Sequence, residues 1–173
     1  MAKTLIKERA EYQRYIIDYL VNDNGFIERK YNETNYDQVN AMDRKLFLSF
    51  IKDTQDEGYQ KILRQYGGNA DDIIVNKYND LVLSKNGMTL DALKHGFDVG
   101  LEHFDLLYTK PTTDINTKSI EDYNKNRFSV MEEVYHKEGE RIDLVLFLDG
   151  IPVLAIELEA STSGHNYKDA IKQ

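Results

Sequence analysis

The stretch from Arg141 to Glu159 constrains the fold more than any other part of the chain. Two runs of β-forming apolar residues, Ile142–Leu148 and Val153–Leu158, flank the pair Asp149-Gly150. An Asp-Gly pair between such runs is a strong signal for the turn of a β-hairpin. Both runs are apolar on both faces, which is typical of central, buried strands. The sequence therefore predicts a hairpin inside a sheet.

Three carboxylates interrupt this apolar hairpin, namely Asp143, Glu157 and Glu159. Burying an unpaired carboxylate is costly, so a buried cluster normally has a cation or a network of donors beside it. Sites made only of oxygen ligands suit Mg²⁺ or Mn²⁺. The alternative is that the three carboxylates lie at strand ends, where they reach solvent or pair with Arg141 and nearby lysines. Spacing alone leaves both interpretations open.

The turn decides whether Asp143 can join the two glutamates. Successive strand residues point to opposite faces. A two-residue loop at Asp149-Gly150 pairs Asp143 with Ile156, which faces away from Glu157. A three-residue loop pairs Asp143 with Ala155 and restores the shared face. A working site therefore requires the three-residue loop or a bulge near Asp143.

The rest of the pattern predicts a helical first half followed by strands. Apolar spacing and stop signals indicate four helices: Lys7–Val21, a helix capped by Asp43 that runs through Ile51, Gln55–Tyr66, and Leu90–His95. The segment Asp71–Leu83 is either a helix or a short strand. Further strands are expected over Leu101–Tyr108 and Phe128–Tyr135, and an irregular segment over Tyr31–Asn40. Tyr12, Tyr15, Tyr19, Tyr59, Tyr66 and Tyr78 have helical spacing, which favours core packing over stacking on bases. We expect an α/β domain with a mixed sheet flanked by helices.

Charge and composition exclude few functions. The net charge of −8 makes the chain a poor non-specific ligand for nucleic acid, but a bound cation would reverse the field at a carboxylate site. Lys118, Lys125, Arg127, Lys137 and Arg141 are interleaved with acidic residues, so they fit a phosphate track and a mixed surface equally well. No membrane-spanning run, apolar signal segment, cysteine or P-loop occurs, and a cytoplasmic location is expected.

Three segments resemble the nuclease domain of the restriction (R) subunit of type I restriction enzymes. They are Asp143–Leu158, Thr162–Gly164 and Asn166–Gln173. Phe50–Gln55 and Asn126–Val130 are also similar to that family. The resemblance implies a restriction-endonuclease-like fold over residues 1–173, as the N-terminal piece of a longer subunit whose later domains form an ATP-driven motor. It also implies Mg²⁺-dependent cleavage of double-stranded DNA, with Mn²⁺ as a substitute, in a complex with modification and specificity subunits.

The resemblance implies a site of the PD-(D/E)xK class. Asp143 and Glu157 match its metal-binding carboxylates, and Glu159 falls on the position of its lysine. Accessory residues common in the class would be Glu8 or Glu11 on the first helix and Gln173 after the site.

Glu159 allows three interpretations. The domain is an inactivated nuclease, or Glu159 is itself a metal ligand, or a lysine of the following segment, Lys168 or Lys172, supplies the missing charge. An inactive domain would serve assembly or DNA docking only.

Overall fold

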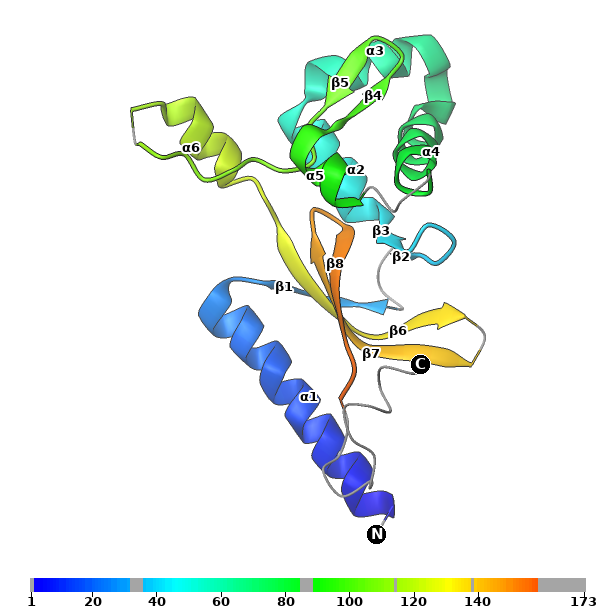
Figure 1. The fold of residues 1–173 in the computed structure, drawn as a ribbon, viewed down its shortest axis with the longest axis vertical. Coiled ribbons are helices and arrows are strands. Elements are labelled where there is room, and N and C mark those ends of the chain that lie inside the picture. Colours follow the sequence, from blue (N-terminus) through cyan, green and yellow to red (C-terminus); the bar gives the residue numbers. More distant parts are fainter. Residues whose placement is uncertain (1, 32–35, 85–88, 114, 138, 159–173) are drawn as a thin grey trace.

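The computed structural model describes residues 2–31, 36–84, 89–113, 115–137 and 139–158 (Figure 1). Its helices are α1 (Ala2–Asn24), α2 (Arg44–Thr54), α3 (Asp56–Tyr66), η2 (Gly67–Asn69), α4 (Ala70–Val82), α5 (Thr89–His95) and α6 (Thr117–Tyr123). Its strands are β1 (Ile27–Lys30), β2 (Tyr36–Asp37), β3 (Met42–Asp43), β4 (Phe97–Val99), β5 (Glu102–Phe104), β6 (Phe128–Lys137), β7 (Glu140–Leu148) and β8 (Ile151–Ile156). Within these residues no helix combines the length and apolar character needed to cross a membrane.

The main sheet is mixed, as predicted. Its strand order is β1-β6-β7-β8, with β1 parallel to β6 and the other neighbours antiparallel. The α/β class is therefore confirmed. The hairpin differs from the prediction in one respect, because β7 is central but β8 forms an edge of the described sheet. Val153 and Leu154 of β8 are accordingly about half exposed.

Helix α1 covers one face of this sheet (Figure 1). Ile17 is buried against Val130 of β6 and Leu144 of β7. Ile16, Leu20 and Val21 complete the apolar stripe at helical spacing. The predicted helix over 7–21 is confirmed and extends further in both directions. This face of the helix sets how close α1 lies to the middle of the sheet.

A second hydrophobic core lies between the helices α2, α3, α4 and α5 and the β4–β5 hairpin. It is built around Phe47, Phe50, Ile74 and Phe104, all fully buried. Asp43 accepts a hydrogen bond from the Leu46 N–H at 3.1 Å, so it caps α2 as predicted. The segment 70–82 is a helix, which settles the choice that the sequence left open.

The sequence missed several short elements. The segment 31–40, expected to be irregular, contains β2, which pairs with β3. The η2 turn was also not predicted. β1 is polar in three of its four residues and is held by pairing with β6, so its own sequence gives little strand signal. The strand predicted over 101–108 is shorter, from Glu102 to Phe104, and its partner β4 was not predicted. Helix α6, which Asn116 caps through the Ser119 N–H, was expected to be part of a turn.

The prediction that the spaced tyrosines pack in the core is wrong for α1. Tyr12, Tyr15 and Tyr19 are 59%, 67% and 54% exposed, whereas Tyr59 and Tyr78 are buried. The difference arises because α1 buries Gln13, Ile16, Ile17 and Leu20 instead, and the tyrosines lie on its outer side.

The turn of the β7–β8 hairpin joins the sheet to the helical core. Asp149 and Gly150 both have positive φ, 50° and 84°, as a two-residue turn of this hand requires. The Asp43 N–H donates to the Gly150 carbonyl at 2.9 Å. A Cβ at Gly150 would lie 2.4 Å from the Asp43 oxygen and 2.6 Å from the Phe47 nitrogen. The turn therefore fits only because it carries no side chain at Gly150.

Gly150→Ala should lower the free energy of unfolding by about 3 kcal/mol, because left-handed strain and steric overlap with α2 add together. Gly25→Ala is the matched control, since Gly25 also has positive φ (70°) but nothing lies within 4 Å of the added Cβ. It should lose only about 1 kcal/mol. Urea unfolding measures both, and equal losses would show that the turn is not packed as described.

Asp149 is a buried carboxylate in the same turn. Its Oδ1 accepts the Arg127 N–H at 2.7 Å, while Oδ2 is buried without a hydrogen-bond partner among the described residues. Burial raises the pKa of Asp149 from 3.8 to about 7, and the Arg127 hydrogen bond only partly opposes this. The folded state thus binds a proton that the unfolded state releases between about pH 4 and pH 7, and stability falls as pH rises through this range.

Asp149→Asn should remove this pH dependence. Asparagine keeps the acceptor for Arg127 and tolerates positive φ. At pH 8 the variant should be more stable than the parent by up to about 4 kcal/mol, the free-energy equivalent of the pKa displacement. At pH 4 the two should be nearly equal. Thermal unfolding across this pH range measures the difference, and a gap of the same size at both pH values would contradict the assignment to Asp149.

Candidate active site

The register of the hairpin brings Asp143 and Glu157 together. The loop has two residues, since Leu148 pairs with Ile151, so the predicted three-residue loop is wrong. The bulge offered as the alternative is present, but nearer the turn than expected. Phe147 pairs with Pro152 whereas Leu146 pairs with Leu154, so Val153 is the extra residue.

Pro152 gives a physical reason for the bulge, because proline has no N–H to donate and is tolerated in edge strands and at bulges. Beyond the bulge, Leu144 pairs with Ile156. One further step in this register sets Asp143 opposite Glu157, and directly opposite residues share a face. The bulge therefore does what the three-residue loop was expected to do.

Asp143 is fully buried, and Glu157 is exposed. The Leu158 N–H donates to Asp143 Oδ2 at 2.7 Å, which ties the carboxylate to the chain directly after Glu157. A buried carboxylate held by a backbone donor, next to a second carboxylate open to solvent, is a set of oxygen ligands that suits a hard divalent cation. No group of three or more His, Cys, Asp or Glu side chains suited to a metal occurs among the described residues. Magnesium is commonly held by one or two carboxylates together with waters and substrate phosphates, so two carboxylates fit this ion.

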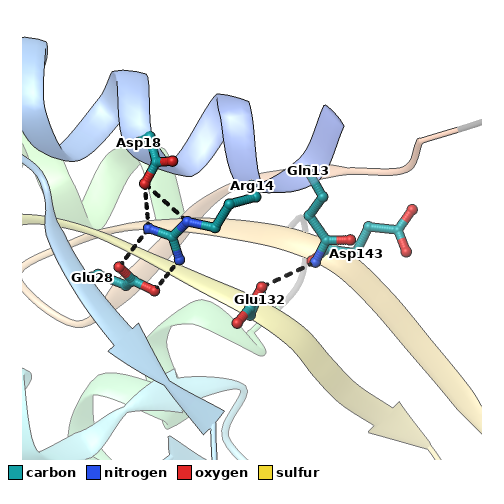
Figure 2. Close-up of polar contacts among 6 residues, drawn as sticks. All are labelled: Gln13, Arg14, Asp18, Glu28, Glu132 and Asp143. Carbon is teal, nitrogen blue, oxygen red and sulfur yellow. Dashed lines mark hydrogen bonds and ion pairs between the residues drawn. The ribbon is translucent and has the colours of Figure 1, made fainter. Parts of the chain in front are cut away.

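Helix α1 reaches the site through Gln13, a residue that the sequence analysis did not single out. Gln13 is 5% exposed, and its amide donates to the Asp143 carbonyl at 3.2 Å. The same nitrogen lies 3.4 Å from Glu132 Oε2 (Figure 2). It also lies 3.3 Å from Glu133 Oε1. A polar residue in the apolar stripe of an amphipathic helix is a signal that could have identified it.

Glu132 and Glu133 are also newly recognised site residues. Consecutive strand residues normally face opposite sides, yet both reach Gln13. Glu133 has φ 57°, a left-handed conformation that is rare outside glycine. Met131 and Val134, three residues apart, consequently pack in the same cluster. This local irregularity directs a second carboxylate of β6 toward the site.

The irregularity is matched on β7. Val145 and Ile142 are again three residues apart and pack in that same cluster. The pairs Glu132↔Leu144 and Val134↔Ile142 keep a constant register around it, which sets Glu133 opposite Asp143. By extension of the two registers, Glu133 of β6, Asp143 of β7 and Glu157, the residue after β8, occupy neighbouring positions.

A second polar contact fixes α1 beside β1. Arg14 bonds Glu28 through two nitrogens, at 2.6 and 2.9 Å, and also bonds Asp18 (Figure 2). These hydrogen bonds raise the pKa of Arg14 and lower the pKa of Glu28. The guanidinium thus stays charged, and α1 is held over the sheet one residue away from Gln13.

Several predicted site residues lie outside the described residues. These are Glu159, Lys168 and Gln173, together with the side chain of Glu8. Glu11 is described and its side chain is exposed on α1. The catalytic role of Glu159 and the accessory roles of the other four residues stay predictions.

Most of the basic residues considered as a phosphate track make ion pairs within the fold. Lys118 and Lys125 both contact Asp122, and Arg127 contacts Asp53 at 2.5 Å. Arg141 contacts Glu133. The mixed-surface interpretation therefore holds for Lys118, Lys125 and Arg127, while Arg141 touches the site through Glu133. The side chain of Lys137 lies outside the described part of the chain.

These features define an α/β domain with a nuclease-like mixed sheet and paired carboxylates on its hairpin. A family model, that of the type I restriction enzyme R protein N terminus, matches residues 6–173. The chain therefore belongs to this family. Searches among curated proteins and among solved structures find no significant match.

Gln13 substitutions test the contact between α1 and the carboxylates. Gln13→Ala should lose about 1–3 kcal/mol of unfolding free energy, since it leaves the Asp143 carbonyl without its donor. Gln13→Glu should lose more at pH 7, because a third carboxylate would face Glu132 and Glu133. The gap between the two variants should close near pH 3, where carboxylates are protonated. Urea unfolding at both pH values measures it, and equal stability at pH 7 would contradict the described contacts.

Proposed function

We propose that this chain is the DNA-cleaving domain of a type I restriction enzyme R subunit. The observation that carries the proposal is the position of Asp143, a fully buried carboxylate next to the Leu144↔Ile156 pair and bonded to the Leu158 N–H, directly after Glu157. Membership of the R-protein N-terminal family supports it. A carboxylate without function at this place would be a costly substitute for an apolar residue.

Asp143 and Glu157 would hold Mg²⁺, or Mn²⁺ in its place. When bound, such an ion polarises the scissile phosphate and lowers the pKa of an attacking water. The Leu158 N–H fixes the orientation of Asp143, and Gln13 holds β7 from the other side through the Asp143 carbonyl. The protein thereby presents the carboxylates in a fixed geometry before DNA arrives.

The substrate would be double-stranded DNA. Modification and specificity subunits would choose the DNA, and a motor domain elsewhere in the subunit would use ATP. The net charge of −8 agrees with a domain that needs partners to bring DNA to it, because it offers little non-specific attraction for phosphate.

One observation favours a second candidate, a nuclease-like domain without activity that serves assembly or DNA docking. Glu159 stands where the PD-(D/E)xK pattern has lysine. A glutamate adds negative charge near an anionic substrate. Loss of one stabilising charge costs about 10²–10³ in rate in enzymes where it has been tested.

Metal binding separates the two candidates. Isothermal titration with Mn²⁺ should show binding to the parent chain and a loss of at least tenfold in affinity for Asp143→Asn, which removes one charged ligand. Asp149→Asn is the matched control, because it makes the same chemical change in the same hairpin away from the site. Undiminished binding by Asp143→Asn would reject the proposed metal site.

Nicking of supercoiled plasmid in Mn²⁺ tests catalysis directly. The parent chain should nick, and Asp143→Asn should reduce nicking by about 10² or more. Glu159→Lys should increase it, since it restores the positive charge of the pattern. Nicking by Glu159→Lys alone would favour the inactive-domain candidate for the chain as it stands.

A further inference from the structure

A phosphate-cleaving centre built on carboxylates needs positive charge to offset the charge of its substrate. Glu132 and Glu133 lie beside the Gln13 amide, which also contacts the Asp143 carbonyl, and position 159 holds glutamate where the pattern has lysine. A phosphodiester adds a further negative charge, which grows on the non-bridging oxygens as the reaction proceeds. A divalent ion offsets part of this charge, but the nuclease pattern also uses a protein cation.

Arg141 is a cation placed beside these carboxylates. It lies on β7 two residues before Asp143, and its Nε contacts Glu133 Oε2. Glu133 in turn lies opposite Asp143 in the register and shares the Gln13 amide with Glu132. A continuous set of contacts therefore connects the guanidinium to the backbone of Asp143.

The backbone of Glu133 holds this arrangement. Its left-handed conformation costs on the order of 1–2 kcal/mol in a non-glycine residue, so surrounding contacts must stabilise it. The Gln13 amide and the Arg141 guanidinium are two such contacts. Backbone strain next to a functional site often serves that site, and here the strained conformation of Glu133 places its carboxylate beside Gln13 and Arg141.

Arg141 is also accessible to a substrate. Its side chain is 47% exposed, whereas Arg127 and Lys125 are drawn into ion pairs away from the hairpin carboxylates. A guanidinium has five N–H donors, so the contact through Nε leaves donors for a second acceptor. Planar, paired donors match two oxygens of one phosphate better than an ammonium does.

We propose that Arg141 is the phosphate-contacting catalytic residue of this chain and takes the role that the pattern assigns to lysine at position 159. The inference rests on the proposed nuclease function. In the reaction, the water oxygen forms a bond to phosphorus as the bond from phosphorus to one ester oxygen breaks. The water proton passes to solvent, and the departing oxygen takes up a proton. Arg141 keeps its protons throughout and donates hydrogen bonds to the non-bridging oxygens.

DNA binding tests the contact without requiring catalysis. The probe is a fluorescently labelled 20-base-pair duplex, with binding followed by anisotropy in Ca²⁺ over a series of salt concentrations. Affinity falls as salt rises, and loss of one phosphate contact makes the slope of log affinity against log salt shallower by about 0.9. Arg141→Gln should show this change and bind about tenfold more weakly, while Arg141→Lys should keep most of the slope. Lys118→Gln is the control, since it removes the same charge from an 82% exposed side chain on α6.

A double-mutant cycle tests the assigned role. In the parent chain, Arg141→Gln should reduce plasmid nicking in Mn²⁺ by about 10²–10³. In the Glu159→Lys background the same substitution should reduce nicking less than tenfold, because lysine supplies the charge. Equal effects in the two backgrounds would reject the shared role.

The outcomes distinguish this inference from the proposed function. If Mn²⁺ binding depends on Asp143 but Arg141→Gln leaves the salt slope unchanged, the metal site stands and the role of Arg141 is overturned. If Mn²⁺ binding does not depend on Asp143, the proposed function fails, and Arg141 loses its catalytic role with it. If no variant nicks plasmid although Mn²⁺ binds through Asp143, the salt slope decides, and an unchanged slope overturns the inference.

Discussion

The contact between Gly150 and the start of α2 determines how the two halves of the domain fit together. The absence of a side chain at Gly150 lets the hairpin turn approach the Asp43 carbonyl and the Phe47 nitrogen within van der Waals distance of their backbone. Asp43 then serves three partners at once, because it also caps α2 and pairs with Arg29 of β1 at 2.8 Å. Since the Asp43 carboxylate is fully buried, the Leu46 N–H and the Arg29 guanidinium each offset part of the cost of its charge, while the Asp43 backbone N–H bonds the Gly150 carbonyl. The helical core, the first strand and the hairpin thus meet at one aspartate and one glycine.

The candidate site depends on this junction through the hairpin. The turn fixes one end of β7 and β8, and the bulge at Val153 then sets the register in which Asp143 meets Glu157. Helix α1 fixes the other end, with Ile17 in the apolar cluster and Gln13 at the Asp143 carbonyl. Neither end alone would hold the carboxylates in place, since a shift of one residue in register turns a strand's side chains to the other face.

The sequence predicted the features that depend on local chemistry. The Asp149-Gly150 turn, the Asp43 cap and the helix over 7–21 each rest on a few neighbouring residues, and all three were found. It did not predict features that depend on distant partners. β1 exists because β6 pairs with it, and Gln13 belongs to the site because α1 crosses β7.

The bulge was foreseen only as an alternative, because its position depends on Pro152 and on the sheet edge rather than on the turn. The exposed Tyr12 and Tyr15 also show that local sequence does not determine which residues pack against distant elements. Helical spacing identifies a stripe, but it does not say which of two stripes faces the sheet.

The paired irregularities of β6 and β7 have a consequence for how such a domain can change over time. In a regular strand, residues on the same face are an even number of positions apart. In β6, however, Met131 and Val134 lie in one cluster although they are three positions apart, and the same holds for Ile142 and Val145 in β7. Because the register is constant from the Phe128↔Leu148 pair to the Tyr135↔Arg141 pair, the two departures compensate each other. An insertion or deletion in one strand alone would turn the charged residues of its outer half inward. The lengths of β6 and β7 are therefore coupled, and a viable change in one requires a matching change in the other.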